Sequence, residues 1–447
     1  MFHVKHKPPH ILLLNPWITD FAAYNFWIKP LGLLYLGGLL KNIGFKISLI
    51  DCLDYTIKTK YYGDGKFFKK KIDKPKALKL IPKNYSQYGI TEEMLFEKLS
   101  KIQEKPNLIC ITSMMTYWYP GVFKLIEIIK DFFKGIPILL GGIYATLCYD
   151  HAIKNSGADF VFKGGNLRDA LKLISKIIGF HSSLQEETIG KISYFFPPFD
   201  LYQGLKYVPI LTSRGCPFRC SYCASYLLTD GFVRRDPLVD VCKEIEHWNI
   251  NYKVENIAFY DDALLIEPKK YFIPMIENII KKGIRCNFHT PNAIHIREID
   301  QEIANLLYRA NFKTIRLGLE TSIEKIQIET GGKVNNQEFL NAIKYLKKAG
   351  YQANEIGVYI MAGLPGQSVE EVRESIIFVR EVGAKPIIVE YSPIPHTPLF
   401  EKAKKFSRYD IENEPLYHNN SILPCEWEEF SFSDFLNLKL KVKRGEI

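Results

Sequence analysis

The sequence predicts an α/β protein with two folded domains, and three features of the chain support that prediction. At 447 residues the chain exceeds what one hydrophobic core usually supports, and 47% hydrophobic composition is ample for burial. The first part alternates short apolar strands with helices, which is typical of a parallel sheet covered on both faces. A second series of such units begins after residue 205. We therefore expect a doubly wound, Rossmann-like domain followed by an open barrel.

The first domain is predicted over residues 1–195. Ligands of doubly wound sheets sit beyond the carboxyl ends of the strands, so the residues at those ends are of interest. The segment 182–206 includes PPFD and no long periodic run, so we place the domain junction there. Strands are expected at 11–14, 45–52, 107–113, 136–142 and 158–165, and helices at 31–41, 122–133 and near Ala152.

The second domain is predicted over residues 205–400, with a helical extension over 401–447. Its strands alternate with helical stretches to give six βα units, which fit an open, partial (β/α)6 barrel better than a closed eight-stranded one. The strand candidates are 207–213, 256–260, 284–289, 314–319, 356–362 and 387–391.

Positive charge is concentrated in one segment of the first domain. The net charge is +10, but the stretch from Lys58 to Lys83 holds ten lysines against two aspartates, so the rest of the chain is nearly neutral. This stretch carries no motif that reads a nucleic-acid groove. We therefore expect a solvated insertion or lid over residues 55–90 and no nucleic-acid partner. Contact with an anion or with nucleic acid is the alternative.

Compartment and redox state follow from the apolar stretches and the cysteines. The longest apolar stretch, LGLLYLGGLL from Leu31, is too short to cross a bilayer. Nine cysteines are an odd number in a large chain without a secretion signal, which favours reduced thiols over a disulfide framework. We expect a cytoplasmic protein with no membrane span.

Three of the cysteines form a compact array, RGCPFRCSYCAS, over residues 214–225. Each of the four irons in a cubane cluster needs a ligand, so three cysteines leave one iron free for a ligand that is not protein. A catalytic zinc site with three cysteines and an open position is the alternative, but no HxE or PCxxC pattern accompanies the array. The sequence therefore predicts a 4Fe-4S cluster on Cys216, Cys220 and Cys223.

This loop, at the start of a βα barrel, resembles the signature loop of the radical S-adenosylmethionine (SAM) superfamily, and the resemblance covers residues 205–400. It implies that SAM chelates the free iron through its amino and carboxylate groups. Reductive cleavage of SAM then gives a 5'-deoxyadenosyl radical. The resemblance also implies a small-molecule substrate and a reductant such as flavodoxin or ferredoxin.

Two further stretches resemble motifs that bind the methionine part of SAM. FYDDALL at 259–265 stands where many members carry Gly-Gly-Glu, and it nominates Asp261 and Asp262 although it departs from that motif. A solvated or helix-capping pair is the alternative for these aspartates. RLGLET at 316–321 nominates Glu320, for which an ordinary salt bridge is the alternative.

Other stretches resemble the adenosine-binding part of the family's site. Tyr222 matches the aromatic position whose backbone contacts adenine. In IMAGLPGQS at 360–368, Gly363 and Gly366 permit a close backbone approach to the nucleoside, although a plain strand-to-helix turn would use the same glycines. His289 and His295 follow the third strand, and a packed or solvent-facing role is favoured for both.

The first domain resembles the cobalamin-binding domain of the large cobalamin-dependent radical SAM class, over residues 10–180. The resemblance rests on residues 29–52, on LLGGIYAT at 139–146 and on GADFVFKGG at 157–165. It implies cobalamin as a cofactor, with Gly141 and Gly142 letting the backbone approach its nucleotide tail; tight turns are the alternative. No DxHxxG loop is present, which implies a cobalt without histidine beneath it or a domain that has lost the cofactor.

The leading hypothesis is therefore a cobalamin-dependent radical SAM enzyme that moves a methyl group to an unactivated centre of a small metabolite. Radical cyclisation or rearrangement without methyl transfer is one alternative. An RNA-modifying radical SAM enzyme, recruited by the basic segment, is the other. No catalytic residue is assigned beyond those that bind the cofactors.

Overall fold

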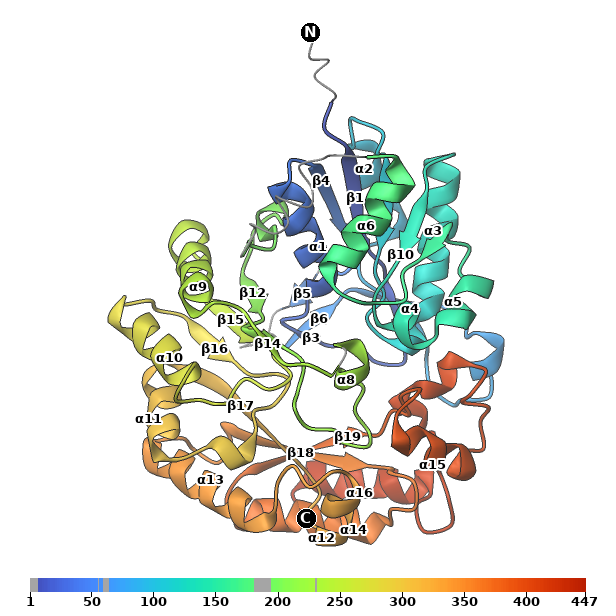
Figure 1. Cartoon of the computed structure of the whole chain (residues 1–447). Helices are drawn as coiled ribbons and strands as arrows, with labels where there is room; N and C mark the ends of the chain where they lie inside the picture. The colour runs from blue at the N-terminus through green and yellow to red at the C-terminus, as the bar shows by residue number, and fades with distance from the viewer. Residues whose placement is uncertain (1–6, 55, 59–63, 181–193, 230) are drawn as a thin grey trace. The chain divides into compact units, whose positions relative to one another are not determined.

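The computed structural model describes residues 7–54, 56–58, 64–180, 194–229 and 231–447. It divides the chain into two compact units, Met1–Leu205 and Lys206–Ile447 (Figure 1). No helix among these residues is long and apolar enough to cross a membrane.

Unit 1 is built on a five-stranded parallel sheet in the order β11-β10-β9-β1-β4. All five strands coincide with predicted ones. Because β1 lies between β4 and β9, the chain direction across the sheet reverses there, and ligands of such sheets bind at the carboxyl ends beside this point. The strands are His10–Asn15 (β1), Lys46–Asp51 (β4), Leu108–Ile111 (β9), Ile138–Leu140 (β10) and Phe160–Val161 (β11).

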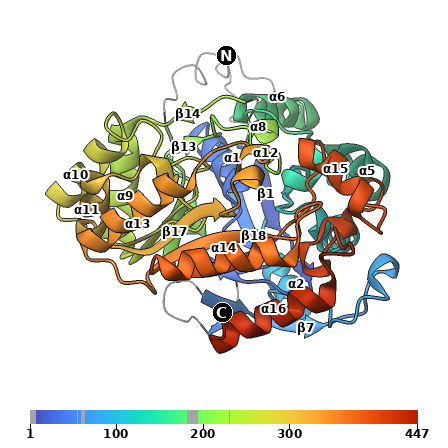
Figure 2. The same cartoon turned by 90° about the horizontal axis from the view of Figure 1, so that it is seen from below.

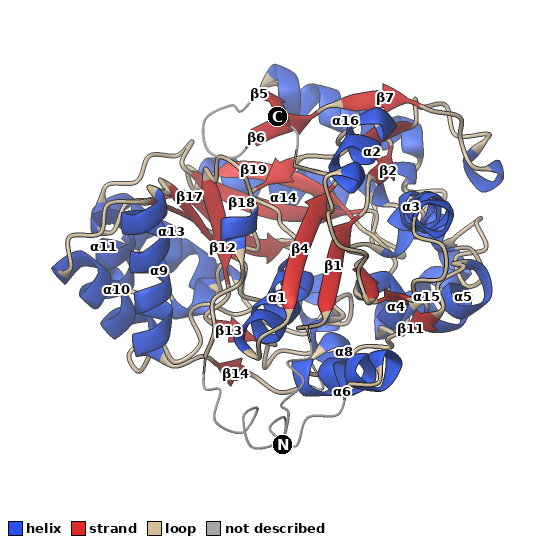
Figure 3. Cartoon of the chain, turned by 90° about the horizontal axis from the view of Figure 1, so that it is seen from above, coloured by secondary structure: helices blue, strands red, loops and turns tan. Residues whose placement is uncertain are grey.

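Helices cover both faces of the unit 1 sheet because successive side chains of a strand point to opposite faces. Ile11 and Leu13 of β1 pack against α1 (Leu31–Asn42) and α6 (Leu167–Ile178). Leu12 and Leu14 pack on the other face against α2 (Glu92–Ser100) and α3 (Tyr119–Phe132) (Figure 3). Two short helices, α4 (Ile143–Leu147) and α5 (Tyr149–Asn155), follow β10.

The lysine-rich insertion, predicted as a solvated insertion or lid, is partly folded into strands. Part of it joins the segment after β1 in two antiparallel sheets, with the orders β2-β8-β7 and β3-β6-β5. Phe67 and Tyr88 are buried with Ile18 and Leu53, and Met114 packs against the same cluster. The three lysines of β7 stay exposed. The strands are Ile18–Asp20 (β2), Asn25–Phe26 (β3), Thr56–Lys58 (β5), Asp64–Phe67 (β6), Lys69–Lys71 (β7) and Ser86–Tyr88 (β8).

Unit 2 contains a six-stranded parallel sheet whose spatial order, β12-β15-β16-β17-β18-β19, follows the chain. The two end strands are edges, so the sheet is open, as six βα units predict. Every predicted strand is present, with ends shifted by a few residues. The strands are Tyr207–Ile210 (β12), Asn256–Phe259 (β15), Asn287–His289 (β16), Phe312–Glu320 (β17), Ile356–Ala362 (β18) and Lys385–Glu390 (β19).

The helices of unit 2 alternate with these strands, and α14 packs beside β18 and β19 (Figure 2). Capping residues fix several helix starts: Asn335 and Ser368 each form a capping box with a glutamate three residues on. The long helices are Leu238–Tyr252 (α9), Phe272–Lys281 (α10), Gln301–Arg309 (α11), Asn336–Ala349 (α13) and Val369–Glu381 (α14).

The C-terminal segment packs onto the βα units of unit 2. Cys425 is fully buried in a cluster with Leu364, Tyr391 and Phe400. Arg380 of α14 donates a hydrogen bond to the Val442 carbonyl. The segment contains α15 (Pro398–Phe406), α16 (Phe432–Arg444) and two short 3-10 turns between them, Pro415–His418 and Asn420–Ile422.

Candidate functional site

The three-cysteine loop begins directly after a two-residue strand, β13 (Ser213–Arg214), which pairs with β14 (Arg234–Arg235). Gly215 has φ of +89°, and a Cβ at this position would lie 2.3 Å from the Phe232 carbonyl oxygen. Only glycine therefore permits this entry into the loop. The loop ends at a short helix, α8 (Ser225–Leu228).

The thiols of Cys216, Cys220 and Cys223 are all free. Cys223 Sγ accepts a hydrogen bond from the Ser225 amide at 3.4 Å, and Cys216 Sγ lies 3.9 Å from His295 Nε2. Among the described residues no three His, Cys, Asp or Glu side chains surround a single ion site. A cubane takes each thiolate on a different iron, so three thiols that hold a cluster need not converge on one point.

The surroundings of the loop disfavour free thiolates. Burial raises the pKa of Cys216 to about 11, and burial also raises the pKa of Cys223. The charge of Asp262 acts in the same direction on both thiols. A positively charged metal centre would offset this penalty, because it stabilises the thiolate form.

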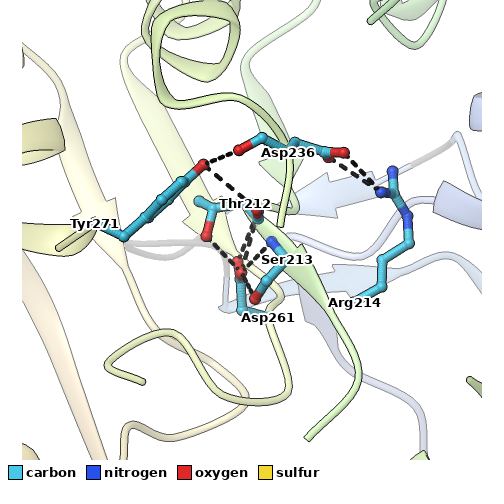
Figure 4. A network of polar contacts seen from close by, with 6 residues as sticks. All are labelled: Thr212, Ser213, Arg214, Asp236, Asp261 and Tyr271. Atoms are coloured by element: carbon cyan, nitrogen blue, oxygen red, sulfur yellow. Dashed lines mark hydrogen bonds and ion pairs between the residues drawn. The ribbon is translucent and has the colours of Figure 1, made fainter. Parts of the chain in front are cut away.

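A buried polar network anchors the base of the loop (Figure 4). Asp261 follows β15 and is 2% exposed. Its carboxylate accepts hydrogen bonds from the backbone N–H and the hydroxyl of both Thr212 and Ser213, at 2.7–3.1 Å. The Tyr271 hydroxyl extends the network by donating to the carbonyl oxygens of Asp236 (2.8 Å) and Thr212 (3.4 Å).

The two nominated aspartates, Asp261 and Asp262, differ in burial and in hydrogen-bond partners. The oxygens of Asp261 are occupied by four protein donors, so its side chain holds the loop. Asp262 is exposed, accepts one hydrogen bond from the Ser225 hydroxyl at 2.7 Å and lies beside the cysteine loop. Of the pair, Asp262 is the aspartate that can reach a ligand.

Glu320 ends β17 in an unusual backbone conformation. Its φ is +67°, and the pairing of β17 with β18 shifts register between Gly318 and Glu320. Bulges of this kind re-aim a side chain at the end of a strand, and positive φ in a residue other than glycine is concentrated at functional sites. The Glu320 carboxylate is 9% exposed and accepts a charged hydrogen bond from Lys333 Nζ at 2.6 Å.

Lys333 is a site residue that the sequence analysis did not nominate. Its ammonium lies 5.7 Å from the centre of the Tyr222 ring, and its side chain is 19% exposed. Burial lowers the pKa of Lys333, but Glu320, Cys220 and Cys223 outweigh burial and leave that pKa raised. The only signal in the sequence is a lysine directly after two glycines, at 331–333.

The nominated adenosine-binding glycines, Gly363 and Gly366, lie in the turn after β18. Gly363 and Gly366 have φ of +84° and +79°, and the side chain of Gln367 accepts hydrogen bonds from the amides of Gly363 and Leu364. Gly363 also serves packing, because a Cβ there would lie 2.7 Å from Leu423. Tyr222 packs against the apolar cluster that contains Leu364.

A cavity of about 360 Å³ with a mixed polar and apolar lining borders the cysteine loop. Ser221, between the second and third cysteines, borders it together with Gly366, Lys325 and Lys402. Apolar side chains, including Ile326, Leu364 and Leu399, also line the cavity, which is open to solvent.

The two nominated histidines have different surroundings. His289 is fully buried and bonded to Thr314 and Asn256, which confirms a packed role. His295 stacks edge-on against Phe218, and burial lowers its pKa to about 4, with Lys333 and Arg297 contributing. It is therefore a neutral neighbour of the cysteine loop at physiological pH.

The glycines of unit 1 also differ from one another. Gly142 has φ of +93°, and a Cβ there would lie 2.3 Å from the Ser113 carbonyl oxygen, so the turn itself requires glycine. A Cβ on Gly141 would meet nothing within 4 Å. At the end of β4, Asp51 accepts hydrogen bonds from Asn15 and Tyr202, both at 2.7 Å, which closes that part of the edge with protein.

Comparison with known proteins identifies the family of the domain that carries the cysteine loop. Residues 210–379 match the family described as the radical SAM superfamily. The chain therefore contains a radical SAM domain over these residues. A 4Fe-4S cluster and SAM are the cofactors that a radical SAM domain implies, and the protein is an enzyme.

Two curated relatives and one solved structure match this chain over most of its length. An uncharacterized methyltransferase, PH0819, of Pyrococcus horikoshii is 25% identical over 79% of this chain and 79% of its own length. Cytidylyl-2-hydroxyethylphosphonate methyltransferase of Streptomyces wedmorensis is 20% identical over 83% of this chain and 77% of its own.

The solved structure is the radical SAM methyltransferase TsrM from Kitasatospora setae, with cobalamin and a [4Fe-4S] cluster bound. It matches 89% of this chain and 75% of its own length with a TM-score of 0.65 and 14% identity. This likeness shows that the chain shares the fold of that radical SAM methyltransferase: a parallel α/β unit followed by the radical domain.

Proposed function

We propose that this radical SAM enzyme is a cobalamin-dependent methyltransferase that acts on an unactivated centre of a small metabolite. The observation that carries the proposal is that one chain contains both a three-cysteine loop and a doubly wound parallel sheet. Unit 2 presents three free cysteines on one loop beside the Glu320–Lys333 pair, and unit 1 presents a parallel sheet with a topological switch point.

Cys216, Cys220 and Cys223 would hold three irons of the cluster. When bound, the cluster would pass an electron from an external reductant to SAM, which would give methionine and a 5'-deoxyadenosyl radical. The protein's part is to fix the loop and limit water at it. Gly215 sets the entry of the loop, and the network around Asp261 holds its base.

Opposite charges beside the loop match the two charged groups of the SAM amino-acid part. A carboxylate, from Glu320 or Asp262, pairs with an ammonium, and the Lys333 ammonium pairs with a carboxylate. The backbone at Tyr222 and at the turn from Gly363 to Gly366 would contact the nucleoside. In that turn the two glycines carry no side chain that would obstruct a close approach.

Cobalamin would bind at the carboxyl ends of the unit 1 strands. When bound, it supplies a methyl group that can pass to a substrate radical. Gly141 has the open space that a close backbone contact needs, whereas Gly142 serves the turn. Of the unit 1 histidines that the structure describes, His10 begins β1, at the opposite end of the strands, and His151 Nδ1 is hydrogen-bonded to Tyr144. We therefore propose a cobalt without histidine beneath it.

Other aspects of the proposal concern partners. A low-potential protein such as flavodoxin or ferredoxin would deliver electrons, and the protein would work in the cytoplasm. RNA modification is less favoured, because the insertion carries no motif that reads a nucleic-acid groove, although its strand Lys69–Lys71 is exposed. Salt-sensitive retention of RNA by the purified protein would reverse that preference.

The cluster is tested by replacing all three cysteines. We expect the Cys216→Ala, Cys220→Ala, Cys223→Ala variant, purified and reconstituted without oxygen, to lose the iron and the visible absorption of the wild type. Retention of about four irons per chain would contradict this assignment, because the six other cysteines would then hold the cluster.

Methyl transfer is tested with SAM that carries a deuterated methyl group. The enzyme is supplied with cobalamin and reductant and assayed over a panel of metabolites. A product that contains the deuterated methyl supports the proposal. Formation of 5'-deoxyadenosine with a converted substrate that contains no such methyl would establish cyclisation or rearrangement instead, and would leave the radical chemistry intact.

A further inference from the structure

Lys333 is fixed beside the cysteine loop by backbone contacts. Gly331 packs so closely that a Cβ there would lie 3.1 Å from the Cys220 Cα. The Ser221 amide donates a hydrogen bond to the Thr330 carbonyl at 3.1 Å. The segment that carries Lys333 is therefore attached to the loop between its second and third cysteines.

The Lys333 ammonium is held in place by close contacts, as its backbone is. Lys333 Nζ is 2.6 Å from Glu320 Oε1, and a Cβ on Gly318 would lie 2.9 Å from Nζ and 3.0 Å from that same oxygen. Glycine at 318 therefore leaves the space that the ion pair occupies. Because the Lys333 side chain is only 19% exposed, solvent screens its charge weakly.

Other charges lie at the loop as well. Arg219 belongs to it, and Arg214, directly before it, pairs with Asp236 at 3.0 Å, with side chains 33% and 17% exposed. Asp262 is the other carboxylate that acts on the cysteine loop. Arg297 acts on His295, but its guanidinium is paired with Glu338 at 3.0 Å and is more exposed. Lys333 and Glu320 are thus the most enclosed opposite charges at the loop among the described residues.

We propose that Lys333 and Glu320 are positioning residues that set the reduction potential of the cluster, Lys333 raising it and Glu320 lowering it. The inference rests on the proposed function, because it requires a cluster on Cys216, Cys220 and Cys223. Reduction adds one electron, taken from an external low-potential reductant, and makes the cluster more negative. A fixed positive charge nearby stabilises the reduced state, and a fixed negative charge destabilises it.

The pair also explains why the enzyme would retain a strained residue at the end of β17. The positive φ of Glu320 costs on the order of 1–3 kcal/mol, and it aims the carboxylate at Lys333. A carboxylate there holds the ammonium in one place and compensates part of its charge. The potential is then set by the difference between two opposed contributions, so it responds to loss of either one.

The experiment is a redox titration of the reconstituted full-length enzyme without SAM, followed by electron paramagnetic resonance of the reduced cluster. The variants are Lys333→Met, Lys333→Arg and Glu320→Gln. We expect Lys333→Met to lower the ratio of reduced to oxidised cluster roughly tenfold at a fixed potential, which is about 59 mV for a one-electron couple. Glu320→Gln should shift the potential upward, and Lys333→Arg should remain close to the wild type.

Opposite shifts separate an electrostatic role from a structural one, because general damage to the site would move both variants in one direction or remove the cluster. Lys439→Met is the matched control: Lys439 pairs with Glu390 at the end of β19, at 2.5 Å, and should leave the potential unchanged. An unchanged potential in Lys333→Met with full cluster content, or shifts of the same sign in both charge variants, would overturn the inference alone. Absence of any cluster in the wild type would overturn the proposed function as well.

Discussion

Asp261 Oδ1 accepts two hydrogen bonds from Ser213, one from the backbone amide and one from the hydroxyl, both at 2.7 Å. Ser213 belongs to β13, directly before the cysteine loop, whereas Asp261 follows β15. The end of one strand of the sheet therefore fixes the base of a loop that begins after its neighbour, β12. Burial raises the pKa of Asp261, and the hydrogen bonds from Thr212 and Ser213 oppose that shift.

Replacing Asp261 with alanine should destabilise unit 2. Two backbone amides and two hydroxyls would lose a buried charged acceptor, so we expect the free energy of unfolding to fall by roughly 3 kcal/mol. Urea unfolding of the purified protein measures the change. Iron content after reconstitution should fall in parallel, because the loop loses its anchor.

Asp262→Ala is the matched control for that substitution. Asp262 is the next residue, but it is exposed and accepts one hydrogen bond, so stability should change by less than about 1 kcal/mol. Equal losses of stability in the two variants would contradict the anchoring role of Asp261.

Glu320→Ala should weaken SAM binding. Loss of a charge-assisted contact typically costs about 1.5–3 kcal/mol, which corresponds to a roughly tenfold to 150-fold increase in the dissociation constant. Equilibrium binding to the reconstituted enzyme under anaerobic conditions measures it. Glu390→Ala removes another strand-end carboxylate with a lysine partner, and it should leave the affinity unchanged. Unaltered affinity in Glu320→Ala would exclude Glu320 from the SAM site.

Gly141 and Gly142 should respond differently to substitution by alanine. Gly142→Ala places a Cβ within 2.3 Å of the Ser113 carbonyl at a positive φ, so it should destabilise unit 1 whether or not cobalamin is present. Gly141→Ala meets no protein atom within 4 Å and should leave stability unchanged. If the Gly141 backbone contacts cobalamin, the same variant should weaken cobalamin binding at least tenfold, as measured by equilibrium dialysis. Wild-type affinity in Gly141→Ala would remove this glycine from the proposed site.

The strands and the cysteine loop could be predicted from sequence because their signals are local. Apolar runs such as ILLL at 11–14 indicate a buried strand wherever the rest of the chain lies, and the spacing of Cys216, Cys220 and Cys223 indicates a metal site by itself. The order of the unit 2 sheet then follows from the usual right-handed crossovers of βα units.

Lys333 and the role of Asp261 could not be predicted in the same way. Lys333 reaches Glu320 because a bulge in β17 re-aims the carboxylate, and no residue type marks that bulge in the sequence. Asp261 and Asp262 are identical residues side by side, and only the direction of each side chain separates a buried anchor from an exposed neighbour of the loop. The ordered part of the insertion depends on pairing between residues 18–20 and 86–88, which are distant in the chain.

The buried histidine of β16 should make stability depend on pH. Burial lowers the pKa of His289 to about 3, with Arg316 contributing, whereas an unfolded histidine titrates near 6.5. Below about pH 6.5 the unfolded chain binds a proton that the folded protein excludes, so the contribution of His289 to stability is present above that pH and is lost as the pH falls toward 3.

His289→Gln keeps a neutral side chain that can bond to Thr314 and Asn256 but removes this titration. Between pH 7 and pH 5 the wild type should lose about 2 kcal/mol more free energy of unfolding than the variant. Urea unfolding at the two pH values measures the difference. His247→Gln, a substitution on a partly exposed face of α9, should retain the pH dependence of the wild type. If the wild type and His289→Gln lose the same free energy over this range, His289 is not the neutral buried group that its contacts indicate.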